Sequence, residues 1–126
     1  MPHLIVQATP NVYIPHEESL LKTLNTVLWD SGEVQQKSDI KARMLPITTF
    51  LVGTDDDEQR FGYVYIELKL MTGRSEATKN ALAEQLLIAT EEKLAKAQSG
   101  RVQIQVCVEV TEISQNYHKK FITHIE

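Results

Sequence analysis

The sequence of 126 residues has only one cysteine, Cys107, so neither an internal disulfide nor a Cys-x-x-Cys metal or redox site can form. It has no excess of basic residues, because 13 lysines and arginines stand against 17 acidic side chains and the net charge is −4. Binding to the phosphate backbone of nucleic acid needs a basic face, so we expect no nucleic-acid partner. No apolar run approaches the roughly 18–20 residues of a membrane span, and the first residues lack the cationic region and long apolar stretch of a signal peptide. We therefore expect no membrane partner and a cytoplasmic location.

Metal-binding patterns are also missing from the sequence. The acidic run at residues 55–58 lacks the spaced ligands and the glycine of an EF-hand loop, and we interpret it as a solvated turn. The histidines show no metal-ligand spacing, so we predict no metal site. The overall composition, 42% hydrophobic and 24% charged, is typical of a globular protein, and the length fits a single domain over residues 1–126.

The spacing of apolar residues predicts two helices and four strands. A stripe of leucines and valines at helical spacing predicts a first helix at about 16–30, and a second stripe predicts a helix at about 75–97. Alternating or continuous apolar stretches predict strands at 3–9, 40–52, 61–70 and 102–110.

The spacing of apolar residues defines the connections between these elements and the ends of the elements less sharply. We expect the second and third strands to form a hairpin across the polar turn at 53–60. Pro46 indicates an edge position or a bulge for the second strand, because proline cannot donate to a ladder. The tail at 114–126 is mixed in character, and its secondary structure stays open.

The predicted elements follow the order β-α-β twice, which indicates two copies of one structural unit. This order predicts an α+β fold of two layers, in which one sheet carries both helices on one face. The opposite face of the sheet would carry polar and aromatic side chains, namely Tyr63, Tyr65, Gln103, Gln105, Cys107 and Glu109. Such a face is either wet or covered by other subunits, and self-association would cover it.

Pro2 is the first candidate for chemistry. A small second residue lets the initiator methionine be removed, which would leave the secondary amine of Pro2 as a compact base at the start of an apolar strand. Each cation within about 6 Å would disfavour the protonated amine by roughly 2–3 kcal/mol at an effective dielectric constant of 20. The alternative is that Met-Pro is simply a common start.

Three basic side chains are candidates for binding an anion. Arg74 directly precedes Ser75, the predicted N-cap of the second helix, where backbone N–H groups and the helix dipole favour negative charge. Lys41 and Arg43 stand two apart on a predicted strand and so project from one face. Each of the three could instead be a solvated surface charge.

The block at residues 1–6 (MPHLIV), the segment at 68–75 (LKLMTGRS) and the doubled β-α-β order together resemble the tautomerase superfamily. Within it, the sequence is most similar to the 5-carboxymethyl-2-hydroxymuconate isomerases, which act in the breakdown of the aromatic compound homoprotocatechuate. The resemblance implies a homotrimer whose three sheets form a central barrel with the helices outside.

The resemblance also implies an activity. It implies a cofactor-independent isomerase that acts on a small unsaturated 2-hydroxy or 2-oxo carboxylic acid such as 5-carboxymethyl-2-hydroxymuconate. Pro2 would be the general base, and Arg74 would bind a substrate carboxylate together with a cation of the second strand. The family has an arginine where this sequence has Lys41, so either Lys41 or Arg43 is the second cation. The alternative function is a non-catalytic trimer on the same scaffold that retains Met1 and binds small acids or another protein.

Overall fold

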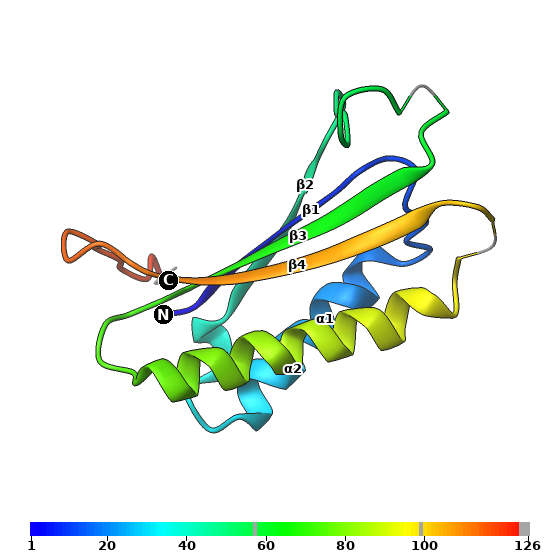
Figure 1. Cartoon of the computed structure of the whole chain (residues 1–126). Coiled ribbons are helices and arrows are strands. Elements are labelled where there is room, and N and C mark those ends of the chain that lie inside the picture. The colour runs from blue at the N-terminus through cyan, green and yellow to red at the C-terminus, as the bar shows by residue number, and fades with distance from the viewer. Residues whose placement is uncertain (57, 99, 124–126) are drawn as a thin grey trace.

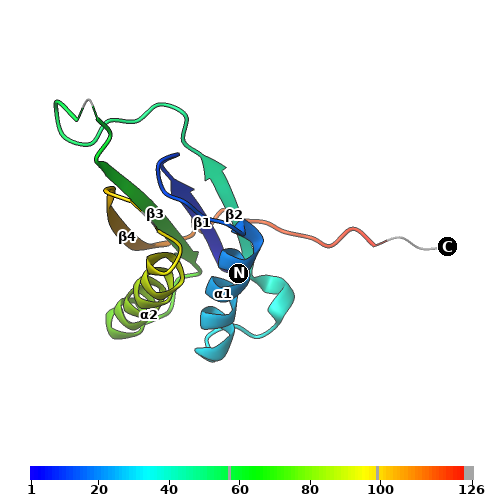
Figure 2. The same cartoon turned by 90° about the vertical axis from the view of Figure 1, so that its right-hand side faces the viewer.

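The structure is a computed structural model that describes residues 1–56, 58–98 and 100–123. Within these residues one four-stranded sheet carries both α-helices on one face (Figures 1 and 2). The predicted two-layer α+β fold is therefore confirmed. The elements in chain order are β1 (His3–Ala8), α1 (Glu17–Asp30), a short 3₁₀ helix η1 (Lys37–Asp39), β2 (Lys41–Pro46), β3 (Phe61–Leu70), α2 (Glu76–Ala95) and β4 (Gln103–Glu112).

The two β-α-β units each form a parallel pair of strands. β1 pairs with β2, with His3 opposite Lys41, and β3 pairs with β4, with Phe61 opposite Gln103. The units join at the centre, where β1 and β3 run antiparallel, so the sheet order is β2-β1-β3-β4. The doubled unit expected from the sequence is thus present in the sheet.

The hairpin expected between the second and third strands is wrong, because β1 lies between β2 and β3. The reason is the apolar content of β1. Leu4 and Val6 are fully buried, and the antiparallel pairing sets them directly opposite Leu68 and Ile66 of β3. β2 has no fully buried residue and takes the edge of the sheet.

β2 is also shorter than expected and ends at Pro46 instead of residue 52. Proline lacks the N–H that a ladder needs, and the edge position that Pro46 indicated is confirmed. The tail is irregular over 113–123, and the Ile113 N–H donates to the carbonyl of Leu70 at 2.7 Å as the chain leaves β4. His124 and Ile125 lie outside the described residues.

The hydrophobic core fills the space between the sheet and the helices. Alternate residues of β3 face this core and are at most 1% exposed, whereas alternate residues of β4 on the other face are exposed. Both predicted helix stripes are buried here, including the hydroxyl of Thr90, which donates to the carbonyl of Leu86 at 2.8 Å. Among the described residues, neither helix combines the length and apolar character needed to cross a membrane. The core residues of the helices are Leu20, Leu24 and Leu28 of α1, and Leu82, Leu86, Thr90 and Leu94 of α2.

Candidate active site

Four segments of the chain meet where β1 begins. They are the N-terminus, the η1–β2 junction, the turn that precedes α2, and the tail at 113–123 (Figure 1). The Lys41 N–H donates to the carbonyl of Pro2 at 3.0 Å, and Tyr117 of the tail contacts His3. Residues that are more than a hundred positions apart in the sequence therefore surround the start of the chain.

Pro2 is buried and lies just ahead of the first residue of β1. Its carbonyl is fixed by the hydrogen bond from β2, so the strand pairing extends up to this residue. Removal of Met1 would convert the nitrogen of Pro2 from an amide into a free amine at a position that the sheet holds in place. The sequence predicted this fixing of the proline by the strand that follows it.

The surroundings of the N-terminus disfavour a protonated amine. The pKa of the Met1 amine is lowered from its ordinary value, first by burial and then by the positive charge of Arg74. Lys119 and Lys41 lower the pKa of this amine further, while Asp39 acts in the opposite direction. An uncharged amine at the chain start is the condition that a general base requires.

Arg74 is half-buried, with 20% of its side chain exposed. One terminal nitrogen donates to the carbonyl of Glu33 at 2.6 Å and the other donates to that of Met71 at 3.3 Å. The buried Nε lies 3.3 Å from Oε1 of Glu33, close enough for an ion pair but without a hydrogen bond of good geometry. Each terminal nitrogen of a guanidinium has a second N–H, so the group can still meet a carboxylate.

The turn before α2 fits the sequence prediction. Ser75 is the N-cap, and its hydroxyl oxygen accepts from the Thr78 N–H at 3.1 Å. Gly73, just before Arg74, has a φ of 114°, a conformation that L side chains rarely adopt, so glycine at this position allows the turn. The turn and the cap together orient Arg74 at the start of the helix.

Lys41 and Arg43 lie on the helix-free face of β2 but contact different groups. The Lys41 ammonium donates to the carbonyls of Asp39 at 3.1 Å and Ser38 at 3.4 Å. Arg43 donates instead to Nδ1 of His3 at 3.1 Å. Lys41 lowers the pKa of both the N-terminal amine and His3, and Arg43 has the larger effect of the two cations on the pKa of His3.

His3 and Tyr117 extend the site in a way that the sequence did not predict. A guanidinium can only donate, so Nδ1 of His3 accepts from Arg43, and Nε2 carries the hydrogen and donates to the Tyr117 hydroxyl at 2.8 Å. The pKa of His3 is lowered by burial and then by Arg43, which keeps the ring neutral. His3 was considered only as a metal ligand, and Tyr117 lies in a tail whose secondary structure the sequence left open, so no sequence pattern pointed to this contact.

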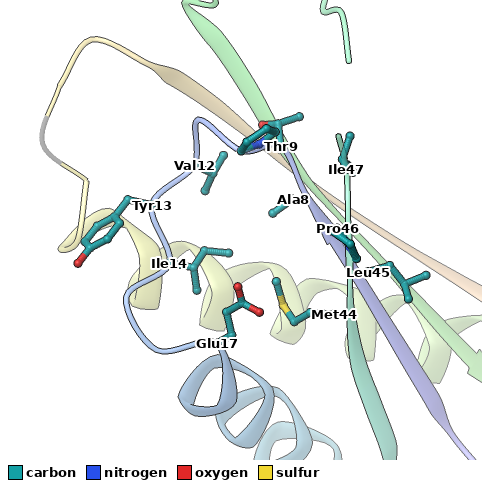
Figure 3. A pocket seen from close by; sticks show the side chains of 11 residues that line it. Ala8, Thr9, Val12, Tyr13, Ile14, Glu17, Met44, Leu45, Pro46 and Ile47 are labelled. Atoms are coloured by element: carbon teal, nitrogen blue, oxygen red, sulfur yellow. The ribbon is translucent and has the colours of Figure 1, made fainter. Parts of the chain in front are cut away.

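A hollow of about 490 Å³ lies at the other end of β1 (Figure 3). Its only charged side chain is the carboxylate of Glu17, which points among apolar groups. A carboxylate-bearing ligand would be repelled there, so this hollow does not compete with the N-terminal site. Its lining residues are Ala8, Thr9, Pro10, Val12, Tyr13, Ile14, Glu17, Met44, Leu45, Pro46 and Ile47.

No group of three or more histidine, cysteine, aspartate or glutamate side chains that could hold a metal ion occurs in the described part of the chain. The groups at the N-terminal site are an amine, several cations, a neutral imidazole and the carboxylates of Glu33 and Asp39. These groups suit a small molecule with negative charge and a transferable proton.

Comparison with known families agrees with this chemistry. A family model described as 5-carboxymethyl-2-hydroxymuconate isomerase matches residues 2–124. The chain belongs to this family. The resemblance to the tautomerase superfamily is thereby confirmed, and the 5-carboxymethyl-2-hydroxymuconate isomerase family identifies the protein as an isomerase. A search of the curated proteins finds no match.

Solved structures support the assignment to the isomerase family. The chain is similar to a 5-carboxymethyl-2-hydroxymuconate isomerase from Deinococcus radiodurans R1, with a TM-score of 0.80 and 28% identity over 94% of this chain and 88% of that one. A 5-carboxymethyl-2-hydroxymuconate delta-isomerase also matches with a TM-score of 0.80, at 20% identity over 96% of this chain and 88% of that one. A member of the cis-3-chloroacrylic acid dehalogenase family matches with a TM-score of 0.70, at 19% identity over 94% and 80% of the two chains. The last two similarities show the shared fold.

We predict that His3 makes the stability of the protein depend on pH. Because the pKa of His3 is lowered in the folded chain, the unfolded chain binds more protons at pH values between the folded and unfolded pKa. This contribution to stability is complete above the unfolded pKa of about 6.5 and is lost as the pH falls toward the folded value. Chemical denaturation at about pH 7.5 and about pH 5.5 should show a larger loss of unfolding free energy for wild type than for His3→Gln.

The control for this prediction is His16→Gln, which changes an exposed histidine and should keep the wild-type dependence on pH. If wild type and His3→Gln lost the same unfolding free energy between the two pH values, the neutral, hydrogen-bonded His3 would be contradicted.

Proposed function

We propose that this isomerase converts an unsaturated 2-hydroxy or 2-oxo acid that carries carboxylates, with 5-carboxymethyl-2-hydroxymuconate as its substrate and without a cofactor. The observation that carries the proposal is the lowered pKa of an amine at the chain start beside Arg74, Lys41 and Lys119. An amine in such surroundings loses its proton more readily than an ordinary α-amine, and the same cations attract a carboxylate.

In this proposal Pro2 is the general base after Met1 has been removed. Its amine takes a proton from the enol oxygen of the substrate or from the neighbouring carbon, which leaves a dienolate. The protonated amine then returns the proton at another carbon of the conjugated chain. The double bond moves, and the amine is regenerated without any change in oxidation state.

Arg74 binds a substrate carboxylate and stabilises the negative charge of the dienolate. The guanidinium is already oriented by the carbonyls of Glu33 and Met71, which supports this role because an oriented donor needs no rearrangement during the reaction.

For the second cation we propose divided roles. Lys41 lies near enough to the amine to lower its pKa, which supports a part in tuning the base. Arg43 uses one nitrogen on His3, and its remaining N–H groups can form the bidentate contact that a lysine cannot. We therefore propose Arg43 as the second carboxylate-binding residue.

We further propose a homotrimer in which the three sheets form a central barrel. The helix-free face supports it, because Tyr65 there hydrogen-bonds to Glu109 and no other part of the described residues covers the row of exposed side chains on β4. A cytoplasmic location and a role in homoprotocatechuate breakdown belong to the same proposal.

We expect a trimer in sedimentation experiments at micromolar concentration. Cys107 lies midway along the edge strand β4 on the helix-free face, so Cys107→Arg should weaken association by adding a positive charge to this face in each of the three copies. Glu91→Arg, a change on the exposed side of α2, should leave association intact. A stable wild-type monomer would contradict the barrel.

We expect Arg74→Ala to lower kcat/KM about 10–150-fold, which corresponds to the loss of one charge-assisted contact worth roughly 1.5–3 kcal/mol. Arg74→Lys should fall between this variant and wild type, because lysine keeps the charge and loses the bidentate geometry. The control is Arg60→Ala, since Arg60 is a solvent-exposed arginine paired with Glu58. The measurement is steady-state kinetics on 2-hydroxymuconate, with thermal unfolding to confirm that each variant is folded. Wild-type kinetics in Arg74→Ala would exclude Arg74 from the site.

We expect kcat/KM to rise with pH through the lowered pKa of the Pro2 amine, because only the free base takes a proton. Pro2→Ala leaves a primary amine and should keep part of the activity. A chain with a short extension ahead of Pro2 makes its nitrogen an amide and should be inactive. Intact mass must be measured for each variant to establish its N-terminus. Full activity of the extended chain would remove Pro2 from the mechanism and favour the non-catalytic trimer that retains Met1 and binds small acids.

A further inference from the structure

The tail at 113–123 passes the start of the chain before it extends beyond β2. It departs from the β4 edge at Ile113, contacts β1 at His3 through Tyr117, and contacts η1 at Asp39 through Lys119. Figure 2 shows the same segment passing to the β2 side of the sheet. The tail therefore crosses the sheet at the end that holds Pro2.

Lys119 lies directly beside the first residue of the chain. Its ammonium nitrogen is 3.2 Å from Oδ1 of Asp39 and 2.9 Å from the sulfur of Met1. The ring of Phe121 lies 5.7 Å from the same nitrogen and adds a cation–π contact. The ammonium thus lies against the side chain of Met1, and removal of Met1 would open the space that this side chain fills.

We infer that Lys119 is a substrate-binding residue, which holds a carboxylate of a substrate with two or more carboxylates next to the Pro2 amine. The inference rests on the proposed function and adds a third cation to Arg74 and Arg43. It also makes the tail a part of the active site.

The contacts of Lys119 leave room for a ligand. An ammonium has three N–H donors, and the ion pair with Asp39 uses one of them, so a substrate carboxylate can bind without displacing Asp39. The side chain is 37% exposed, while that of Asp39 is 16% exposed. The anchor is thus the more buried partner, and the cation is the more accessible one.

Tyr117 is the positioning residue for this part of the site. It accepts a hydrogen bond from His3, which in turn accepts one from Arg43. The chain of two hydrogen bonds fixes the tail two residues before Lys119 and links it to the cation of β2. Loss of the Tyr117 hydroxyl should therefore loosen Lys119 while leaving its charge in place.

Binding of inert acids to the chain processed to Pro2 tests Lys119 without turnover. Calorimetry should show that wild type prefers the dicarboxylate adipate to hexanoate, a monocarboxylate of equal length. Lys119→Ala should weaken adipate binding about tenfold and reduce this preference, as expected for one charge-assisted contact. Lys119→Arg should restore most of the preference, and Lys120→Ala, which removes the neighbouring exposed cation, should match wild type.

A second measurement separates ligand binding from mere anchoring of the tail. Asp39→Asn removes the ion pair but keeps the ammonium, so adipate should still be preferred, whereas a pure anchor would make this variant behave like Lys119→Ala. The pH dependence of kcat/KM gives an independent readout. Lys119 lowers and Asp39 raises the pKa of the N-terminal amine of Met1. If the Pro2 amine responds in the same way, its pKa should rise in Lys119→Ala and fall in Asp39→Asn. The other charged groups that act on this amine, Arg74 and Lys41, are unchanged in both variants. Tyr117→Phe should weaken adipate binding less than Lys119→Ala.

The outcomes for this site and for the proposed function are distinct. Adipate binding that depends on Lys119, in a protein that isomerises no 2-hydroxymuconate, would support the site and overturn the isomerase reaction proposed here. Normal isomerase activity with equal adipate affinity in Lys119→Ala and Lys120→Ala would overturn the role of Lys119 and leave the reaction untouched.

Discussion

The central position of β1 is the constraint on which the rest of the molecule depends. Its apolar face, formed by Leu4 and Val6, is fully buried between the helices and the rest of the sheet. Pairing on both edges then fixes the residue that precedes the strand, because the hydrogen bond from β2 reaches Pro2. A chain terminus is normally the least ordered part of a domain, and here core packing holds it in place.

Charge near this terminus opposes protonation of two groups at once. The N-terminal amine and His3 both have a lowered pKa, with burial as the largest cause in each case and neighbouring cations as the next. For a basic group, a lowered folded pKa means that stability falls as the pH drops through the interval between the unfolded and folded values. The arrangement therefore costs stability as the pH falls, and burial of the chain start contributes more to this cost than the neighbouring cations do.

The sequence allowed the prediction of features that depend on local periodicity. The two helices, the alternation of β3 and the cap at Ser75 follow from spacing within a few residues, and the structure agrees with them. The order of the strands in the sheet could not be predicted from spacing within a few residues. A hairpin of β2 and β3 satisfied turn chemistry, but only the burial of β1 from both sides decides the order, and that burial depends on contacts between distant segments.

The candidate site shows the same division. Arg74 and Lys41 could be proposed because a helix start and an alternating strand carry recognisable patterns, and the structure brings the charges of both near the amine. Lys119 and Tyr117 could not be proposed, since an irregular tail has no period and its partners His3 and Asp39 lie at the other end of the sequence. The unfolded chain holds none of these groups together, so its N-terminal amine has ordinary basicity. Folding itself thus lowers the pKa of the amine, because it buries the chain start and brings the positive charges of Arg74, Lys41 and Lys119 near it in the same step.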